Sequence, residues 1–438
     1  MTSTDQRRGP HQSRLWPPPP YEARLASTIE EIFGSGVHDL PGLVLALNTS
    51  GIAAPDGTVW GEASLAEQIQ TLAADISNMG PKRSTTARAE RPMAPKVPLS
   101  AEMLMALGMR NRWYAICPSS DVNTGALLQA TRFGIDWVIM RCADGSLSML
   151  EDRCPHRGAA LSLGSHLGDR VQCVYHGVQV GGDGTVVAVP GMPGCGLEGK
   201  RLVASLPVVE QADAIFAYLG DETHPDPVPF GLPVPLADPE NSHFLAYVEW
   251  ECGWRYAVEN VLDPSHGAFL HRESHTMGAG EFAAEYRIEE TDDGFMFEKT
   301  TQRDVNFDWV AYHETGADWL ELSIPYPRTA GPGGPFGIVG MVTPIDAGRS
   351  AVSFWRYRKA SGWERDVWRF LYKTSIEERH FAVLEQDRRL LESLAADADQ
   401  HENLYQHDLG IVRYRRMLRR EADRQASALA AIESRPEL

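Results

Sequence analysis

Between residue 99 and residue 225, apolar residues occur in short runs that are separated by turns rich in Gly and Asp. Within several runs, apolar and polar positions alternate, which is typical of strands with one buried face. The strands expected from this pattern are WVIMRC, SLSMLE, RVQCVYH, TVVAVP and AIFAYLG. Because these strands are short and closely spaced, the pattern predicts a compact all-β domain over residues 99–225.

After a proline-rich connector, strand-like runs are mixed with longer helical patterns. Helices are expected around residues 257–270 and 363–396. The expected strands are HFLAYVEWEC, GFMFEKTTQ, WLELSIPYP and GIVGMVTPI. This mixture predicts an α+β fold for residues 226–425, with a tail over residues 426–438.

The pattern before residue 99 is helical. Over residues 25–80 we expect a small helical module, in which Pro41 opens one helix that stops near Gly51. Ser64 and Glu67 have the spacing of a capping box for the next helix. Residues 1–24, with their four consecutive prolines, indicate a disordered tail, and residues 81–98 indicate an exposed basic linker.

Residues 46–69 resemble the helical segment of site-specific recombinases, which raises the question of DNA binding. Residues 25–80 contain no Lys or Arg against seven acidic residues. Neutralisation of phosphates by basic side chains supplies most of the affinity for DNA, so this composition argues against a nucleic-acid partner. We expect a packing or protein-interaction module instead.

The composition narrows the class of protein further. The chain has 438 residues, a net charge of −18 and six cysteines. This charge disfavours nucleic acid and anionic membranes as main partners. No apolar run reaches the roughly 20 residues of a membrane span, and no export signal is visible. Six cysteines are too few for a disulfide framework in a chain of this length, which favours a reducing cytoplasm.

Two cysteines and two histidines stand in the stretch CPHRGAALSLGSHLGDRVQCVYHG. Cys154 and His156 form one pair, and Cys173 and His176 form the second. Zinc is one candidate, because two Cys and two His are a common set of ligands in structural zinc sites. However, each pair mixes one thiol with one imidazole. This favours a two-iron cluster in which one iron binds thiolates and the other imidazoles, with a reduction potential of roughly −150 to +300 mV.

The stretches CPHRGA and CVYHG resemble the Rieske cluster motif of ring-hydroxylating oxygenases. Respiratory Rieske proteins would have additional cysteines in the two loops, where this chain has Ala159 and Tyr175. One departure from many relatives is Val178, where they carry Trp. His166, which lies between the two pairs, is expected to be an ordinary loop histidine.

A second candidate metal site is found in ENVLDPSHGAFLH, which offers Asp263, His266 and His271. Its spacing is not that of a zinc peptidase. Two histidines and one carboxylate are the ligands of non-haem iron(II) sites that activate dioxygen. The third ligand must then come from another part of the chain.

The helix SIEERHFAVLEQDRRLLESLAADA provides a candidate. Asp387 falls within its expected apolar stripe, whereas Glu385 points the opposite way, and a buried carboxylate needs a partner. A metal or a salt bridge to an arginine would serve. His380 is expected to be a core histidine or a group that supports a ligand. The stripe is defined by Ile376, Val383, Leu384, Leu390, Leu391 and Leu394.

Both segments are similar to the catalytic domain of Rieske non-haem iron oxygenases, and the resemblance covers roughly residues 99–420. It implies a helix-grip type of antiparallel sheet, with His266, His271 and Asp387 binding the iron and His275 as a fallback. It also implies a head-to-tail homotrimer, in which Asp263 bridges His266 and the partner subunit's His176.

The resemblance implies the terminal oxygenase component of a multicomponent system. It would use O2, a 2Fe–2S cluster, Fe(II), and electrons from NAD(P)H through a separate reductase, with or without a ferredoxin. We expect hydroxylation or O-/N-demethylation of an aromatic or similarly hydrophobic small molecule. The alternatives are a Rieske electron-transfer protein and a DNA-associated redox sensor. The aromatic residues expected near the pocket are Trp254, Phe269, Phe307, Trp309 and Tyr312.

Overall fold

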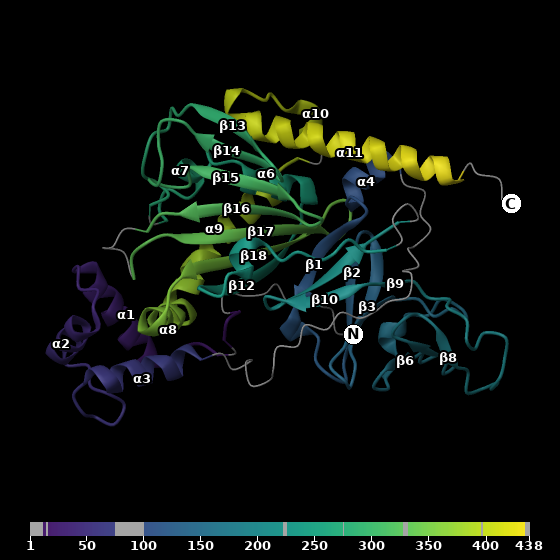
Figure 1. Ribbon diagram of the computed structural model, residues 1–438, viewed down its shortest axis with the longest axis horizontal. Coiled ribbons are helices and arrows are strands. Elements are labelled where there is room, and N and C mark those ends of the chain that lie inside the picture. The colour runs from purple at the N-terminus through teal and green to yellow at the C-terminus, as the bar shows by residue number, and fades with distance from the viewer. Residues whose placement is uncertain are drawn as a thin grey trace.

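The computed structural model describes most of the chain and shows three regions (Figure 1). The expected linker at 81–98 and the fallback ligand His275 lie outside the described residues. The described residues are 12–14, 16–74, 100–221, 226–274, 276–326, 332–395 and 397–433.

The region between residues 112 and 219 consists of three small antiparallel sheets, with the strand orders β1-β11-β10, β2-β3-β4-β9 and β5-β6-β7-β8. The expected strands are all present, although RVQCVYH is a strand only over its first three residues because Cys173 begins a turn. The strands are β1 (Arg112–Pro118), β2 (Leu127–Arg132), β3 (Ile135–Arg141), β4 (Leu147–Glu151), β5 (Ser165–His166), β6 (Arg170–Gln172), β7 (Gln179–Gly181), β8 (Val186–Ala188), β9 (Ser205–Leu206), β10 (Val208–Gln211) and β11 (Ala214–Leu219).

The following region is built on a seven-stranded antiparallel sheet with the order β12-β18-β17-β16-β15-β14-β13. Its strands are β12 (Asn241–Trp250), β13 (Tyr286–Thr291), β14 (Gly294–Lys299), β15 (Trp309–Glu314), β16 (Asp318–Ile324), β17 (Phe336–Pro344) and β18 (Ser350–Lys359). Its helices, with α4 from the preceding segment, are α4 (Ala101–Leu107), α5 (Val234–Ala237), α6 (Trp254–Leu262), α7 (Gly267–Leu270), α8 (Gly362–Leu371), α9 (Glu377–Glu392), α10 (Ala398–His401) and α11 (Leu409–Glu433).

Two helices predicted from the sequence are interrupted in the structure. The expected helix at 257–270 is divided into α6 and α7 at Asp263 and Pro264, because proline lacks the N–H that a continuous helix needs. The expected helix at 363–396 is divided into α8 and α9 by a π-helical turn, Tyr372–Ile376. Such turns are frequent at functional sites.

The prediction of a tail over residues 426–438 is wrong for residues 426–433, because α11 continues to Glu433. Ala422 is fully buried and Ala426 packs against the main core of the large sheet, so the apolar face of the helix extends past the predicted end. In Figure 1, α11 runs along one edge of the molecule beside β13.

The N-terminal module consists of α1 (Pro20–Gly34), α2 (Leu40–Ser50) and α3 (Glu62–Ala73). The predicted stop of α2 is confirmed: Gly51 follows it with a left-handed φ of 80°. The capping box at Ser64 and Glu67 is wrong, because the N-cap of α3 is Gly61, three residues before Ser64. The Ser64 hydroxyl instead accepts from the Gly61 N–H at 3.0 Å. The tail predicted for residues 1–24 is too long, since α1 begins at Pro20.

This module is packed onto the large region rather than standing apart from it. Figure 1 shows the three helices beside α8. Leu25, Leu47 and Leu65 share one core with Trp368 and Tyr372. The Lys373 ammonium, in the π-helical turn, donates to the carbonyl oxygens of the last residues of α3 at 3.0 and 2.7 Å. The module therefore contacts the segment that leads into α9.

The small sheets join the large sheet through an aromatic core. Trp113 and Phe216 from the small sheets pack with Trp319 and Trp355 from the large sheet. The hairpin sheet β5–β8 is directed away from this joint, and Figure 1 shows β6 and β8 at the opposite end of the molecule from α7 and α9. The two candidate metal sites are therefore separated within one chain.

Candidate metal centres

The first candidate site is formed by two loops of equivalent backbone geometry. The Cys154 N–H donates to the Ala159 carbonyl at 2.8 Å, and the Cys173 N–H donates to the Val178 carbonyl at 2.8 Å. Each loop then closes through a glycine four residues after the cysteine, with φ of 76° and 72°. Positive φ suits glycine at these turns because a Cβ would be strained there. The sequence CPHRGA and the sequence CVYHG thus make the same turn.

Within these loops, the two thiols and the two imidazoles differ in their exposure to solvent. Cys154 and Cys173 are both buried, whereas His156 and His176 are exposed. The imidazole rings contact each other with centroids 4.6 Å apart. Burial raises the pKa of the Cys154 thiol, and the neighbouring Cys173 thiol raises it further. A cluster with thiolates on one iron and imidazoles on the other needs this partition.

The surroundings of the loops are held by local hydrogen bonds. The Asp152 carboxylate is buried and accepts from the Ser162 N–H at 2.6 Å and from its hydroxyl at 2.5 Å. Val178 is buried in the core beneath the cysteines, where it fills the place after His-Gly. The prediction of a loop histidine at His166 is wrong, because His166 is the second residue of the short strand β5. Its Nε2 lies 3.1 Å from the Arg141 carbonyl oxygen.

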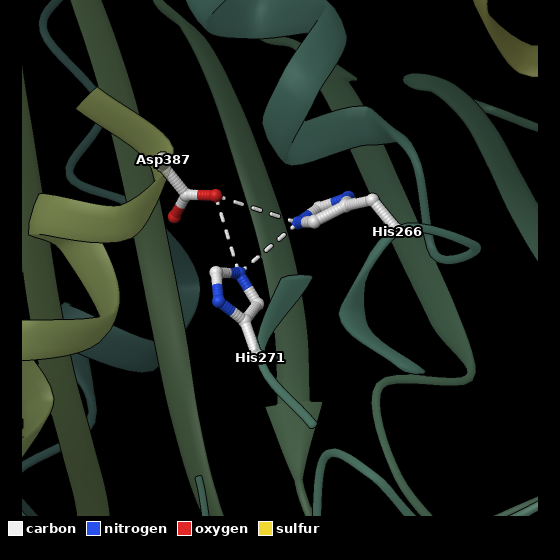
Figure 2. A group of neighbouring side chains, drawn as sticks. All are labelled: His266, His271 and Asp387. Carbon is white, nitrogen blue, oxygen red and sulfur yellow. Dashed lines mark hydrogen bonds and ion pairs between the residues drawn. The ribbon is translucent and has the colours of Figure 1, made fainter. Parts of the chain in front are cut away.

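The second candidate site brings together three residues from distant parts of the chain (Figure 2). His266 Nε2 lies 3.2 Å from His271 Nε2, and Asp387 Oδ1 lies 3.6 and 3.2 Å from these two nitrogens. All three donor atoms lie within 4.8 Å of one another. An ion at their centre would have three protein ligands on one side, with the remaining coordination positions open.

The interruption at Asp263 and Pro264 explains how both histidines reach the site. His266 precedes the first residue of α7 and His271 follows its last residue, so the short helix presents them from its two ends. The π-helical turn before α9 contains one residue more than an α-helical turn, so it changes the direction in which the side chains of α9 point. Asp387, three turns into α9, is 6 % exposed and faces the two histidines.

Each proposed ligand also contacts a supporting side chain. His266 Nδ1 lies 3.6 Å from Asp263 Oδ2, His271 Nδ1 lies 2.8 Å from Gln386 Oε1, and the Asn260 amide donates to Asp387 Oδ1 at 3.3 Å. Partners of this kind fix the tautomer and the orientation of imidazole ligands. Gln386 was missed from the sequence, although its place directly before Asp387 is visible there.

The electrostatics of Asp263 agree with a charged carboxylate. Burial raises the pKa of Asp263, but the imidazole of His266 nearby and the hydrogen bonds from Ser265 outweigh burial and leave the pKa below the usual range. For His266, burial lowers the pKa, but the carboxylates of Asp263 and Asp387 raise it by more. The pKa of His266 is therefore above its usual value. The Asp263 carboxylate is also held by the Ser265 N–H at 2.7 Å.

The arginine salt bridge considered for Asp387 is not what the structure contains, because its contacts are the two histidines and Asn260. Glu385 does point away, toward Arg388. The predicted apolar stripe is partly wrong: Leu390 is 41 % and Leu394 42 % exposed. The buried stripe is narrower and consists of Glu377, His380, Leu384, Asp387 and Leu391.

A cavity with an empty volume of about 670 Å³ opens beside the three residues. This volume includes space that is open to solvent, and most of the lining side chains are apolar. Of the aromatic residues predicted for the pocket, Phe307 lines it. Trp254 and Tyr312 are core residues, Phe269 is exposed, and Trp309 stacks under Arg303. The lining residues include Asn260, Val261, Ser274, Met277, Phe307, Leu322, Ile324, Tyr326, Phe336, Ile338, Phe354, Arg356, His380, Val383 and Leu384.

Comparison with family models gives three matched ranges. Residues 112–207 match the Rieske 2Fe-2S domain, and residues 250–424 match the vanillate O-demethylase oxygenase C-terminal domain. Residues 3–74 match a recombinase-like helix-turn-helix domain, in agreement with the resemblance seen in the sequence.

Two oxygenase components are similar in sequence to part of the chain. The chain is 32% identical over 165 residues to the oxygenase component of chloroacetanilide N-alkylformylase from Rhizorhabdus wittichii, covering 37% of this chain and 47% of the relative. It is 30% identical over 178 residues to the vanillate O-demethylase oxygenase subunit of Pseudomonas sp., covering 38% and 46%. The matched region thus spans less than half the length of these relatives.

The fold agrees with that of a solved oxygenase. The chain superposes on the carbazole-bound oxygenase–ferredoxin complex of carbazole 1,9a-dioxygenase with a TM-score of 0.61 and 21% identity, covering 75% of this chain and 96% of that one. The combination of a Rieske domain with this C-terminal domain is that of Rieske oxygenase alpha subunits, and the homologues of the chain are such subunits. Among the described helices, none combines the length and apolar composition that a bilayer crossing requires.

The residues present fit both cofactors that this pair of domains implies. The loops offer two thiols and two imidazoles on separate sides, as a Rieske cluster requires. The second site offers two imidazoles and one carboxylate, as non-haem iron(II) requires.

Proposed function

We propose that this protein is the terminal oxygenase component of a multicomponent Rieske oxygenase, acting on an aromatic or similarly hydrophobic small molecule. The observation that carries the proposal is the position of His266, His271 and Asp387 at the wall of an apolar cavity, in the same chain as the Cys/His loops. The reaction is hydroxylation or O-/N-demethylation, the chemistry of oxygenases with this pair of domains.

In this proposal Cys154, His156, Cys173 and His176 hold the 2Fe–2S cluster, and His266, His271 and Asp387 hold iron(II). The cluster supplies electrons and the iron supplies the site at which dioxygen is activated. The protein's own side chains orient these ligands: Asp263 holds His266, Gln386 holds His271, and Asn260 holds Asp387. The apolar wall excludes water and positions the substrate beside the open side of the iron site.

The assembly proposed is a homotrimer in which the loops of one subunit lie against the iron site of the next. Its support is that the hairpin sheet with β6 and β8, which adjoins the Cys/His loops, lies far from α7 in Figure 1, and that His156 and His176 are exposed. Asp263 is the proposed bridge, because its carboxylate holds His266 and could accept a hydrogen bond from the partner subunit's His176. The electrons come from NAD(P)H through a separate reductase, with or without a ferredoxin.

The described structure offers little support for a DNA-associated sensor. The apolar faces of α1, α2 and α3 are buried together against α8, and the residues from 25 to 80 contain no Lys or Arg. We infer a packing role for this module, and we place the protein in the cytoplasm on its cysteine usage.

The test is metal analysis of protein purified without oxygen. We expect about three irons and about two acid-labile sulfides per chain, together with the EPR signal of a reduced Rieske cluster after dithionite treatment. Oxygen consumption should then require both a reductase and an aromatic substrate. Zinc without acid-labile sulfide would contradict the proposal.

A further inference from the structure

One wall of the cavity contains a buried cation that the proposed oxygenase chemistry does not use. Arg356, on β18, is 2 % exposed and lines the cavity among aromatic and aliphatic side chains. Its guanidinium donates to the Tyr372 hydroxyl at 3.2 Å and to the His380 carbonyl oxygen at 3.1 Å. Both partners are uncharged. In the described part of the chain, no carboxylate lies within salt-bridge distance of Arg356.

One acidic group that interacts electrostatically with Arg356 from beyond salt-bridge distance is engaged elsewhere. Glu377, at the start of α9, is buried, and its carboxylate oxygens accept from the Ser13 N–H at 2.8 Å, the Ser13 hydroxyl at 2.6 Å and the Gln12 N–H at 3.0 Å. Burial raises the pKa of Glu377, and the distant guanidinium of Arg356 is the smallest of the opposing influences. Arg356 therefore has five N–H donors, two neutral acceptors and a cavity in front of it.

The location of Arg356 relative to the candidate iron site is set by α9. Arg356 bonds to the backbone of His380, which is seven residues and about 10 Å of helix before Asp387. Arg356 and the three residues of the candidate iron site thus line the same cavity, together with Phe336 and Phe354. An aromatic compound with an anionic group and a reacting substituent suits a cavity whose wall contains both a cation and the candidate iron site.

We propose that Arg356 binds the anionic group of the substrate, so that the substrate is an aromatic acid rather than a neutral aromatic compound. A buried charge without an anionic partner is costly, and a planar guanidinium binds a carboxylate or sulfonate through two parallel hydrogen bonds. The inference rests on the proposed function, because that function makes the cavity the substrate site. It adds the chemical class of the substrate and a residue that determines it.

The test is ligand binding without turnover. Calorimetric titration would compare benzoate, 4-methoxybenzoate and benzenesulfonate with their uncharged amides. In the wild-type protein we expect at least one acid to bind more tightly than its amide. In Arg356→Gln that acid should bind about 10- to 100-fold more weakly, as expected for loss of a charge-assisted bidentate contact. Its amide should bind as before, and Arg356→Lys should recover part of the affinity.

Arg358 provides a matched control. It lies two residues further along β18, on the same face of the sheet, but its guanidinium donates to the Gly333 carbonyl and stacks on Trp368, and it is not part of the cavity wall. Arg358→Gln should keep the preference for the acid.

Two results would overturn the inference. The first is that no acid binds the wild-type protein more tightly than its amide, and this comparison remains decisive even if Arg356→Gln does not fold. The second is that Arg356→Gln weakens acid and amide equally, which would make Arg356 a structural residue. Failure of the proposed function would be seen separately, as absent iron or sulfide, because the titration needs neither turnover nor a reductase.

Discussion

The Cys/His loops take their four donor residues from one stretch of 23 positions between Cys154 and His176, whereas the His/Asp site combines α7 with a helix more than a hundred residues later. The loops are hairpin turns closed by their own backbone hydrogen bonds, and their imidazoles are exposed. His271 and Asp387 of the second site are buried, beside a cavity that is lined by the large sheet, α6 and α9. An exposed centre suits electron exchange with another molecule, and an enclosed one suits control of what reaches the metal.

The largest effect is expected from Cys154→Ser, which removes one of the two buried thiols of the loop site. We expect acid-labile sulfide to be lost and turnover to fall by more than about 100-fold, because a ligand contributes more than the groups that support it. The second site should keep its iron, since the two sites share no residue. Cys195→Ser, at a cysteine outside the motif, is the control, and sulfide analysis is the measurement.

Asp387→Ala should have the complementary effect. Loss of the carboxylate leaves two imidazoles, so the mononuclear iron should be lost while the cluster signal in EPR remains. Glu385→Gln, on the outward face of the same helix, should retain both centres. If Asp387→Ala also loses the cluster, the two sites are not independent and Asp387 is needed for the fold.

A smaller effect is expected from Gln386→Leu, which removes the hydrogen-bond acceptor 2.8 Å from His271 Nδ1. His271 would then be held in one orientation less strongly, and the affinity for iron(II) should fall by about 10- to 100-fold. Titration of the metal-free protein with iron(II) under anaerobic conditions measures this. Unchanged affinity would show that packing alone orients His271.

The smallest effect is expected where the N-terminal module meets the large region. Lys373→Met removes the donor to the last carbonyls of α3 and should lower the free energy of unfolding by about 1–3 kcal/mol. Iron at the second site should be held slightly less well, while the cluster content should not change, because Lys373 lies in the turn before α9. Thermal unfolding measures the change, with the exposed Lys359→Met as the control. An equal loss of both centres would contradict a local role for the module.

Much of this protein could be predicted from local patterns. The strands follow from alternating apolar positions, and the loop site follows from four residues with a characteristic spacing, because a hairpin turn is specified by the few residues that form it. The break between α6 and α7 could also have been anticipated, since Pro264 is visible in the sequence. The position of Asp387 was deduced from one apolar stripe, although Leu390 and Leu394 in that stripe are exposed.

The sequence by itself thus determined which residues could bind metals and that two different centres belong to one chain. Only the tertiary structure decided which side chains surround them. Gln386 stands next to Asp387 in the sequence, but its contact with His271 has no local signal. The same holds for the place of Arg356 in the cavity wall, because strands and helices that are distant in sequence meet there. The physical reason is that donor type and turn geometry are local properties, whereas burial and the shape of a cavity are created only when the sheet and α9 pack together.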